Sequence, residues 1–376
     1  MSSATLPLEV ACVITAMGCG GAERVLAALA RHLAARGHGV RLHVLNEPDV
    51  FFDLPAAVEV RAFARAPHAA AARATRPWRR LRWLREQLAA ASPDVVVSFI
   101  EVANVLALLA ARGLGLPVVV AERSNPHRHP VPWPYGWLRP WLYRGAARVV
   151  VQTEATAAWA RRLVAPERVA VLPNPVWPPG DAEPELALGP GRWLVSMGRL
   201  VPLKRFDMIL EVFAQLAPRH PEWSLLILGE GEQRPALERA VMRHGLGGRV
   251  LLPGAVRAPA ALLRRCDLFV LASEYEGFPN ALGEAMACGL PAVAFDCPTG
   301  PAEIVRDGVD GVLLPNGDRQ ALQAALDRLM ADDQARLRLA ARAGEVVQRF
   351  DAARILARWE ALVGSLATGR RTPRGA

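Results

Sequence analysis

The chain has 376 residues, a formal net charge of +9 and five cysteines, and 52% of its residues are hydrophobic. At about 150 residues per domain this length suggests two domains, and the composition excludes a disordered chain, a collagen and a small disulfide-rich scaffold. The cysteines form no Cys-x-x-Cys pair, so neither a disulfide framework nor a zinc site is indicated. No basic region opens the chain and no apolar run reaches the roughly 18 residues of a spanning helix, so we expect a protein of the cytoplasm.

Short apolar segments alternate with amphipathic segments of helix length in the first half of the chain, the pattern of a parallel sheet covered by helices. Strands are predicted at residues 10–17, 40–46, 58–63, 94–100, 117–123, 148–153 and 169–173. Helices are predicted between them at residues 21–36, 76–91 and 153–163. Residues 175–191 then hold five prolines together with acidic residues, which is typical of a linker between domains.

The alternation begins again after this linker. Strands are predicted at residues 193–197, 225–228, 250–252, 268–272, 291–295 and 311–314, and helical segments run from 318 to about 366. We therefore expect an α/β protein of two doubly wound parallel-sheet domains, residues 1–174 and 192–349, facing each other across a cleft, with a flexible tail at 367–376. Ligands of such sheets bind beyond the carboxyl ends of the strands, so the loops after strands are where chemistry is expected.

The loop between the first predicted strand and the first helix is rich in glycine. Gly20 and Gly21 would let backbone amides approach a phosphate or a sugar at the start of the helix. Glu23 occupies the third glycine position of a dinucleotide-binding fingerprint, and Leu200 replaces the tyrosine that should stand four residues before the only lysine. Both departures disfavour a nicotinamide-dependent enzyme. A tight turn that needs small residues remains the alternative.

A second loop of interest opens the C-terminal half. It holds Gly198 and Arg199 at the end of a predicted strand. Lys204 follows five residues after Arg199, in the first turn of a helix that is predicted to begin near residues 202–203. Lys204 is the single lysine against 44 arginines, which favours a position where a compact ammonium is preferred to a guanidinium fork. Two cations at a helix N-terminus are unfavourable for the helix dipole, and they are explained if they bind an anion such as a diphosphate. A solvated basic turn is the alternative.

A third segment, EGFPNALGEAMACGLP, begins at Glu276. It reads as a polar loop leading into a helix that Asn280 can cap and Gly289 can end. The free amides of residues 278–281 can hold phosphate or sugar oxygens, while Glu276 and Glu284 offer carboxylates to hydroxyl groups. The alternative is two glutamates that face water, because a carboxylate at an apolar helix end is costly unless it is paired or solvated.

These three segments resemble the retaining nucleotide-sugar glycosyltransferases of family 4, which have the GT-B fold, and the resemblance covers essentially the whole chain. It rests on Gly198-Arg199 with Lys204, on the Glu-x7-Glu pair Glu276 and Glu284, and on the early Gly-Gly-Ala-Glu-Arg sequence. The Glu-x7-Glu segment is highly specific, whereas the glycine turn alone is not. Residues 296–311 further resemble a bacterial branch that extends lipid-linked oligosaccharides for surface polysaccharide or protein glycosylation.

The resemblance implies a role for each of these residues. Arg199 and Lys204 would neutralise the diphosphate of the donor and of the leaving nucleotide. Glu276 would face the donor sugar, and Glu284 would accept hydrogen bonds from the ribose hydroxyls. The remaining donor contacts would come from Gly198, Phe278, Pro279, Asn280, Gly20 and Gly21. The last helix, residues 350–366, would pack back on the N-terminal domain.

The reaction implied by the family needs no metal ion, and the sequence has no Asp-x-Asp motif. The charge on the leaving group can be met by Arg199, Lys204 and a helix N-terminus, so we predict neither a metal nor another cofactor. Retention is commonly described as a front-face attack, in which the departing phosphate helps to deprotonate the incoming hydroxyl. The assisting residue of the N-terminal domain stays open between Glu122, Arg123 and His127, which follow the fifth predicted strand.

Two segments combine arginine with tryptophan. Residues 76–85 carry Trp78 and Trp83 among several arginines, and residues 132–144 carry three more tryptophans. Tryptophan and arginine on one helix suit an interface with anionic lipid, and an arginine-rich helix with its tryptophans in the core is the alternative. We predict no nucleic-acid partner, because no nucleic-acid-binding module is present.

We therefore predict a glycosyltransferase of the cytoplasm or of the inner face of the cell membrane. It would move a sugar from a nucleotide-sugar, such as UDP-GalNAc or UDP-GlcNAc, to a glycan acceptor on a polyprenyl diphosphate, with retention of configuration. Two alternatives stay open. One is a catalytically silent subunit that binds sugar nucleotides or lipid-linked glycans, and the other is an NAD-dependent oxidoreductase.

Overall fold

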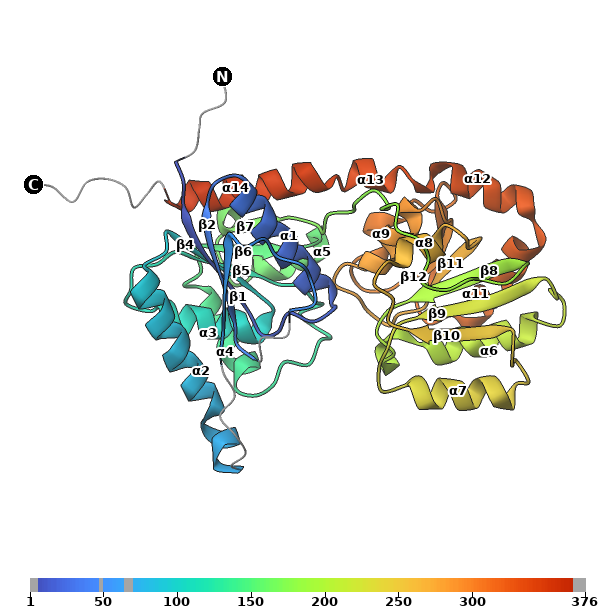
Figure 1. Ribbon diagram of the computed structural model, residues 1–376, viewed down its shortest axis with the longest axis horizontal. Helices are drawn as coiled ribbons and strands as arrows, with labels where there is room; N and C mark the ends of the chain where they lie inside the picture. Colours follow the sequence, from blue (N-terminus) through green and yellow to red (C-terminus); the bar gives the residue numbers. More distant parts are fainter. Residues whose placement is uncertain (1–5, 47–49, 64–69, 368–376) are drawn as a thin grey trace, which may run out of the picture. The chain divides into compact units, whose positions relative to one another are not determined.

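The computed structural model describes residues 6–46, 50–63 and 70–367, so nearly all of the predicted tail lies outside the described residues (Figure 1). The chain divides into two compact units. Unit 1 comprises residues 1–175 and 353–376, and unit 2 comprises residues 176–352. Each unit has its own sheet and its own hydrophobic core.

Unit 1 is built on a seven-stranded parallel sheet in the order β3-β2-β1-β4-β5-β6-β7. Its strands are β1 (Glu9–Ile14), β2 (Gly39–Val44), β3 (Val58–Ala62), β4 (Val95–Phe99), β5 (Val118–Ala121), β6 (Arg148–Val151) and β7 (Val169–Val171). Its helices are α1 (Gly21–Ala35), α2 (Ala70–Ala91), α3 (Glu101–Ala111), α4 (Tyr135–Tyr143), α5 (Glu154–Ala160) and the last helix of the chain, α14 (Ala352–Ala367).

Burial on both faces of the sheet explains these strands. β4 and β5 consist of buried residues throughout, as is typical of a parallel sheet that helices cover on both sides. Val96 of β4 belongs to the core beneath α2 and α3, whereas Phe99 points to the opposite face. There its ring centroid lies 5.4 Å from that of Trp359 in α14, and Arg358 donates a hydrogen bond to the carbonyl of Val171 at 2.9 Å. The C-terminal helix thus packs on unit 1.

Unit 2 is built on a six-stranded parallel sheet in the order β10-β9-β8-β11-β12-β13. Its strands are β8 (Arg192–Met197), β9 (Trp223–Leu228), β10 (Val250–Gly254), β11 (Leu268–Leu271), β12 (Ala292–Asp296) and β13 (Gly311–Pro315). Its helices are α6 (Phe206–Leu216), α7 (Arg234–Arg243), α8 (Pro259–Leu263), α9 (Asn280–Ala287), α10 (Pro301–Ile304), α11 (Arg319–Ala331), α12 (Asp333–Ala343) and α13 (Val346–Arg349).

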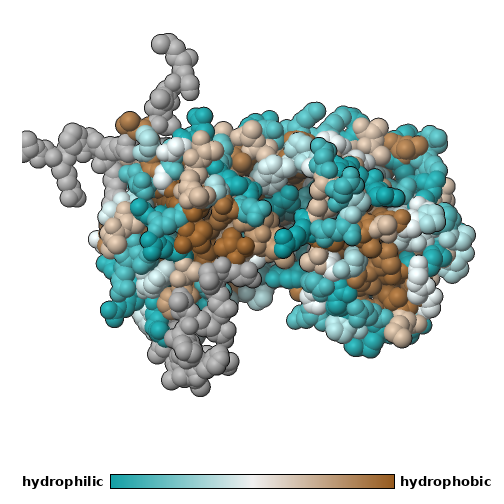
Figure 2. Space-filling view, in the orientation of Figure 1, coloured by the Kyte–Doolittle hydropathy of each residue, from teal (hydrophilic) through white to brown (hydrophobic). Residues whose placement is uncertain are grey.

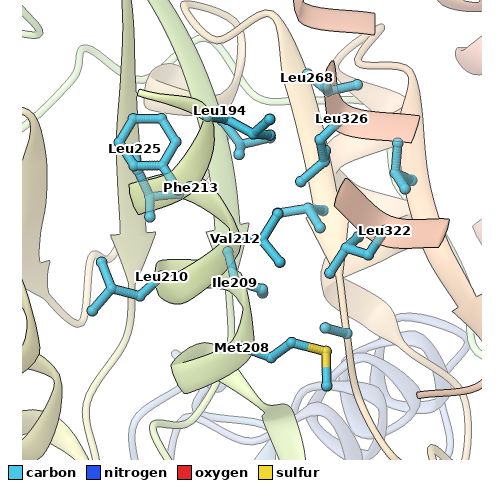
Figure 3. Packing of buried hydrophobic residues seen from close by; sticks show 14 of the residues in the cluster. Leu194, Met208, Ile209, Leu210, Val212, Phe213, Leu225, Leu268, Leu322 and Leu326 are labelled. Atoms are coloured by element: carbon cyan, nitrogen blue, oxygen red, sulfur yellow. The ribbon is translucent and has the colours of Figure 1, made fainter. Parts of the chain in front are cut away.

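Alternate side chains of the unit 2 strands build two cores, one on each face of the sheet. Leu268 of β11 belongs to the core with α6 and α11, whereas its neighbour Phe269 belongs to the core with α8 and α9. In the first of these cores, Val212 of α6 points toward Leu322 and Leu326 of α11 (Figure 3). The sheet is therefore covered on both faces.

The predicted linker at residues 175–191 is fully described and contains no helix or strand. It nevertheless packs with unit 2. Leu188 is buried in the core that contains α9, and the Val176 amide donates a hydrogen bond to the carbonyl of Phe350 at 2.9 Å. The proline-rich segment is thus a fixed part of this unit rather than a loose tether.

The two strand orders confirm the predicted α/β class with doubly wound parallel sheets. In unit 2 the chain order reverses between β8 and β11, which are hydrogen-bonded neighbours. Ligands of doubly wound sheets bind at such a reversal, beyond the carboxyl ends of the strands. In unit 2 this place is bounded by residues 198–205 after β8 and residues 272–279 after β11.

Hydrophilic side chains cover much of the visible surface, with hydrophobic patches among them (Figure 2). Within the described ranges of the chain, no helix combines the length and the apolar character that crossing a bilayer requires. Most of the large apolar side chains lie in the cores of the two units, and the exceptions include four tryptophans of unit 1.

Candidate active site

The loop after β8 positions Lys204. It runs from Gly198 into a short 3₁₀ turn at Pro202–Lys204, and Arg205 follows with φ +51° before α6 begins at Phe206. A left-handed conformation is uncommon outside glycine, and here it separates the turn from the helix. Lys204 therefore lies just before the helix and not in its first turn, which corrects the sequence-based expectation.

Glu276 comes from the loop after β11, the strand next to β8 in the sheet. Its Oε1 accepts a hydrogen bond from Lys204 Nζ at 2.5 Å. The side chain of Glu276 is 9% exposed and that of Lys204 is 20% exposed, so the pair is shielded and still touches solvent. A hydrogen bond between two charged groups is stronger than a neutral one. The structure thus joins two residues that the sequence analysis had placed in separate segments.

A third loop, after β12, holds the backbone of Glu276. The Glu276 amide donates to the carbonyl of Pro298 at 3.4 Å, and the Thr299 hydroxyl donates to the Glu276 carbonyl. Thr299 has φ +66°, which is strained for a β-branched residue. Gly300 has φ +103°, and a Cβ there would lie 2.5 Å from Cδ of Pro279. Sequence reasoning missed this support, although the Pro-Thr-Gly-Pro sequence is a turn signal.

The segment between Glu276 and α9 offers backbone rather than side chains. The Phe278 side chain is buried, and its ring lies 5.3 Å from that of Phe350, while Pro279 is also buried. α9 begins at Asn280 with Pro279 in the N-cap position, and no side chain makes the cap hydrogen bond. The predicted capping by Asn280 is therefore wrong. Gly289 ends the helix with φ +85°, as predicted.

Glu284 and Arg199 complete the residues expected in unit 2. Glu284 lies on α9, one turn past its start, and is half-buried. Gly283 beside it packs against Val176, because a Cβ at Gly283 would lie 2.9 Å from Cγ2 of that valine. Arg199 is exposed, and its guanidinium makes no hydrogen bond or ion pair with any described residue. No described contact therefore holds the Arg199 guanidinium beside the Lys204 ammonium.

Gly20 and Gly21 lie in unit 1, where Gly20 is the N-cap of α1 and Gly21 is its first residue. The carboxylate of Glu23 folds back over Gly20, so that a Cβ on Gly20 would clash with it. A negative charge at this end of a helix is favourable for the helix dipole. The place where the sequence predicted a donor phosphate thus already has an anionic neighbour from the same chain.

The three candidates for assistance from unit 1 differ in access. Glu122 has no exposed side-chain surface, accepts a hydrogen bond from the Tyr143 hydroxyl and lies 3.5 Å from Arg139, and burial raises the pKa of Glu122 to about 7. Arg123 stacks on a buried phenylalanine ring at 4.4 Å, and burial lowers the pKa of Arg123 to about 9. His127 is the exposed member of the three. These surroundings favour packing roles for Glu122 and Arg123.

The arginine-rich segment 76–85 lies in α2. One of its tryptophans is exposed, as a lipid interface would require, and the other is packed in the unit. Trp78 is 74% exposed. Trp83 instead packs in unit 1, where its ring centroid lies 6.0 Å from that of His43 and 5.8 Å from that of Phe63.

The described part of the chain contains no group of three or more His, Cys, Asp or Glu side chains suited to hold a metal ion.

Two family matches cover most of the chain. Residues 19–178 match Glycosyltransferase Family 4, and residues 183–346 match Glycosyl transferases group 1. An exopolysaccharide phosphotransferase of Streptomyces coelicolor is 38% identical over 240 residues, which are 62% of this chain and only 25% of that protein. A Campylobacter jejuni enzyme is 26% identical over 366 residues, which are 96% of this chain and 99% of that protein. It is named GalNAc-alpha-(1->4)-GalNAc-alpha-(1->3)-diNAcBac-PP-undecaprenol alpha-1,4-N-acetyl-D-galactosaminyltransferase.

The crystal structure of Anabaena HepE in complex with UDP superposes with a TM-score of 0.76 at 20% sequence identity, over 95% of this chain and 100% of that one. At this identity the likeness shows the fold. The two parallel α/β units of the present chain agree with it. With one family match on each unit and a relative aligned from end to end, this chain belongs to the GT-B glycosyltransferases of family 4.

Proposed function

We propose that this enzyme transfers a sugar from a UDP-sugar, such as UDP-GalNAc or UDP-GlcNAc, to a glycan carried on a polyprenyl diphosphate. The transfer retains the anomeric configuration and needs no metal ion. The name of the Campylobacter relative supports the lipid-linked acceptor and the N-acetylhexosamine, and the UDP bound to HepE supports the uridine base.

The observation that carries this proposal is the contact between Lys204 and Glu276. It joins the loops after β8 and β11 at the reversal of strand order, where a doubly wound sheet binds its ligand. An ammonium group has three N–H donors, and Glu276 takes one of them, so Lys204 keeps donors for a diphosphate. Glu276 keeps acceptor capacity for a sugar hydroxyl. One ion pair can therefore hold the sugar and the phosphates of a single donor.

The rest of unit 2 supplies the remaining contacts of this proposal. The exposed guanidinium of Arg199 offers a second cation to the diphosphate. The N-terminus of α9 follows directly on the Glu276 loop, and the positive end of its helix dipole would favour a donor phosphate placed there. Glu284, half-buried on the same helix, accepts hydrogen bonds from the ribose hydroxyls.

Retention follows in this proposal from attack on the face that the leaving group departs from. The acceptor hydroxyl forms a bond to the anomeric carbon as the bond from that carbon to the UDP oxygen breaks, and the hydroxyl proton passes to the departing phosphate. Lys204 and Arg199 stabilise the negative charge that grows on UDP, which is the task a metal ion has in other transferases.

The test is calorimetric titration with UDP, GDP, ADP and NAD in excess EDTA, followed by a product assay. We expect UDP to bind without metal, and UDP-GalNAc or UDP-GlcNAc to extend a polyprenyl-diphosphate-linked glycan with an α linkage. Binding of UDP without any product would favour a catalytically silent subunit. Binding of NAD alone would favour an oxidoreductase, and product formation that EDTA abolishes would refute metal independence.

A further inference from the structure

Helix α4 of unit 1 presents its tryptophans to solvent and buries its charged residue. Trp137 and Trp141 lie one turn apart on the outer face and are 67% and 61% exposed, and Trp133, four residues before Trp137, is 86% exposed. On the opposite face Arg139 and Tyr143 are buried. A surface helix normally places its apolar face toward the core and its polar face outward. In α4 the inner face does carry the core residue Tyr143, but two large aromatic side chains remain on the outer face.

A polar network fixes this orientation. Tyr143 donates a hydrogen bond to the buried carboxylate of Glu122 and accepts one from Asn104 Nδ2 at 2.8 Å. The guanidinium of Arg139 lies over the ring of Trp159 at 4.9 Å and donates to the carbonyl of Pro126, in the loop that precedes α4, at 3.1 Å. Burying ionisable groups is costly. The inner side of α4 thus combines this polar network with the core packing of Tyr143 and Leu142, and the three indole rings lie outside both.

The surroundings of this helix are positively charged. Residues 123–153 contain five arginines and neither aspartate nor glutamate. Arg144 lies over the exposed ring of Trp141 at 5.0 Å. Helix α3 packs between α4 and α2 in unit 1, and all three helices contribute to the same hydrophobic core (Figure 1). α2 adds the exposed residues Trp78 and Arg79.

We propose that this tryptophan face, made of Trp78, Trp133, Trp137 and Trp141 with the exposed arginines Arg79 and Arg144, docks on the anionic surface of a lipid bilayer. Indole rings prefer the interface between headgroups and acyl chains, and arginine attracts anionic lipid phosphates. The partner is the inner leaflet of the cell membrane, where a lipid-linked acceptor would be met. The inference needs no particular donor, acceptor or reaction.

The test is flotation of the full-length chain with vesicles, without donor or acceptor. One set contains phosphatidylglycerol and phosphatidylcholine in equal parts, and the other contains phosphatidylcholine alone. We expect binding to the anionic set that weakens as salt is added. The double variant Trp137→Ala/Trp141→Ala should lose at least about tenfold in partition coefficient, because two large aromatic surfaces no longer leave water.

A matched control comes from unit 2, where Met242 and Leu337 are 80% and 62% exposed. The double variant Met242→Ala/Leu337→Ala should bind vesicles as the wild type does. Both double variants should keep the melting temperature and the activity on a detergent-dispersed short-chain acceptor, since the replaced side chains are exposed. Wild-type binding by the tryptophan variant, or equal binding to both vesicle sets, would overturn the proposal. So would a wild-type dimer that the tryptophan variant dissociates, because the face would then bind a second copy.

Discussion

Lys204 is the one lysine in a chain with 44 arginines, and it lies 2.5 Å from a carboxylate that is 9% exposed. We expect Lys204→Ala to weaken UDP binding by about 1.5–3 kcal/mol, the range for a hydrogen bond to a charged group. Lys204→Arg should restore only part of this affinity, because a planar guanidinium cannot replace a compact ammonium beside Glu276. Calorimetric titration of the three proteins with UDP measures both effects. Wild-type affinity in Lys204→Ala would contradict the role given to this residue.

Glu276 is expected to act on turnover more than on nucleotide affinity. Glu276→Gln should reduce kcat by about a hundredfold, as loss of one preorganised electrostatic contact does. It should leave UDP binding equal or slightly tighter, since Lys204 is released from its partner. Glu274→Gln is the matched control, because Glu274 is exposed on the same loop and pairs with Arg205 at 3.5 Å. Equal losses of turnover and affinity in Glu276→Gln would show that the residue has been misplaced.

Thr299 is a positioning residue in this interpretation, because its hydroxyl holds the backbone of Glu276 while its own backbone is strained. Thr299→Val keeps the shape and removes the hydroxyl, so we expect a lower kcat, a nearly unchanged KM for the donor and a stability loss of about 1 kcal/mol. Thr299→Ser keeps the hydroxyl and should restore kcat. Steady-state kinetics with both variants distinguishes this role from a purely structural one. A purely structural role would lower the stability of Thr299→Val but give both variants the same kcat.

At the scale of elements, strands were predictable and helix orientation was not. Strands such as β4 (Val95–Phe99) are short apolar runs, since helices cover both faces of a parallel sheet, and local composition is enough to find them. The orientation of α4, with its tryptophans facing solvent, involves the pairing of Glu122 with Arg139, and these two residues meet only in the folded unit. Likewise, Trp78 and Trp83 look alike in sequence, and only packing against His43 separates them.

The site shows the same division. The loops of Lys204 and Glu276 were predictable, because each follows an apolar run and carries polar residues. Their direct contact was not, since it requires β8 and β11 to be neighbours although more than 70 residues separate the two side chains. The support from Thr299 comes from yet another strand end, and its φ angle of +66° has no signal in the sequence.

The buried network behind α4 predicts a pH dependence of stability. Burial raises the pKa of Glu122 to about 7 in the folded chain, against 4.5 for an ordinary glutamate. The folded state therefore holds a proton that the unfolded state releases, and this contribution is full below about pH 4.5 and is lost as pH rises through about 7. Relative to Glu122→Gln, the wild type should lose up to about 3 kcal/mol between these limits.

Denaturant unfolding at several pH values measures this difference. Glu167→Gln serves as the control, because it replaces the same type of side chain in the same unit at an exposed position. Parallel pH profiles of the wild type and Glu122→Gln would mean that burial does not shift the pKa of the Glu122 carboxyl group into this range, which would contradict the prediction.

At the scale of the whole molecule, length and composition predict two domains, and each unit indeed has its own sheet and core. The path of the chain between them is harder to infer. An amphipathic pattern shows that the last helix buries one face, but it does not show which core receives it. The contact of Trp359 with Phe99 identifies the core of unit 1, because it packs the last helix against a strand more than 250 residues earlier in the chain.

Because the two units have separate cores, heat should unfold this chain in more than one step. Arg199, Lys204, Glu276 and Glu284 all belong to unit 2, so UDP should stabilise that unit by mass action. At about 100 times its dissociation constant, a ligand adds about 2.7 kcal/mol, which raises the midpoint of a unit of this size by about 5–10 °C. Differential scanning calorimetry should therefore show one transition that moves with UDP and one that stays, and Lys204→Ala should shrink the shift. A single transition that moves as a whole would instead mean that the two units unfold together, and that binding at one sheet is felt by both.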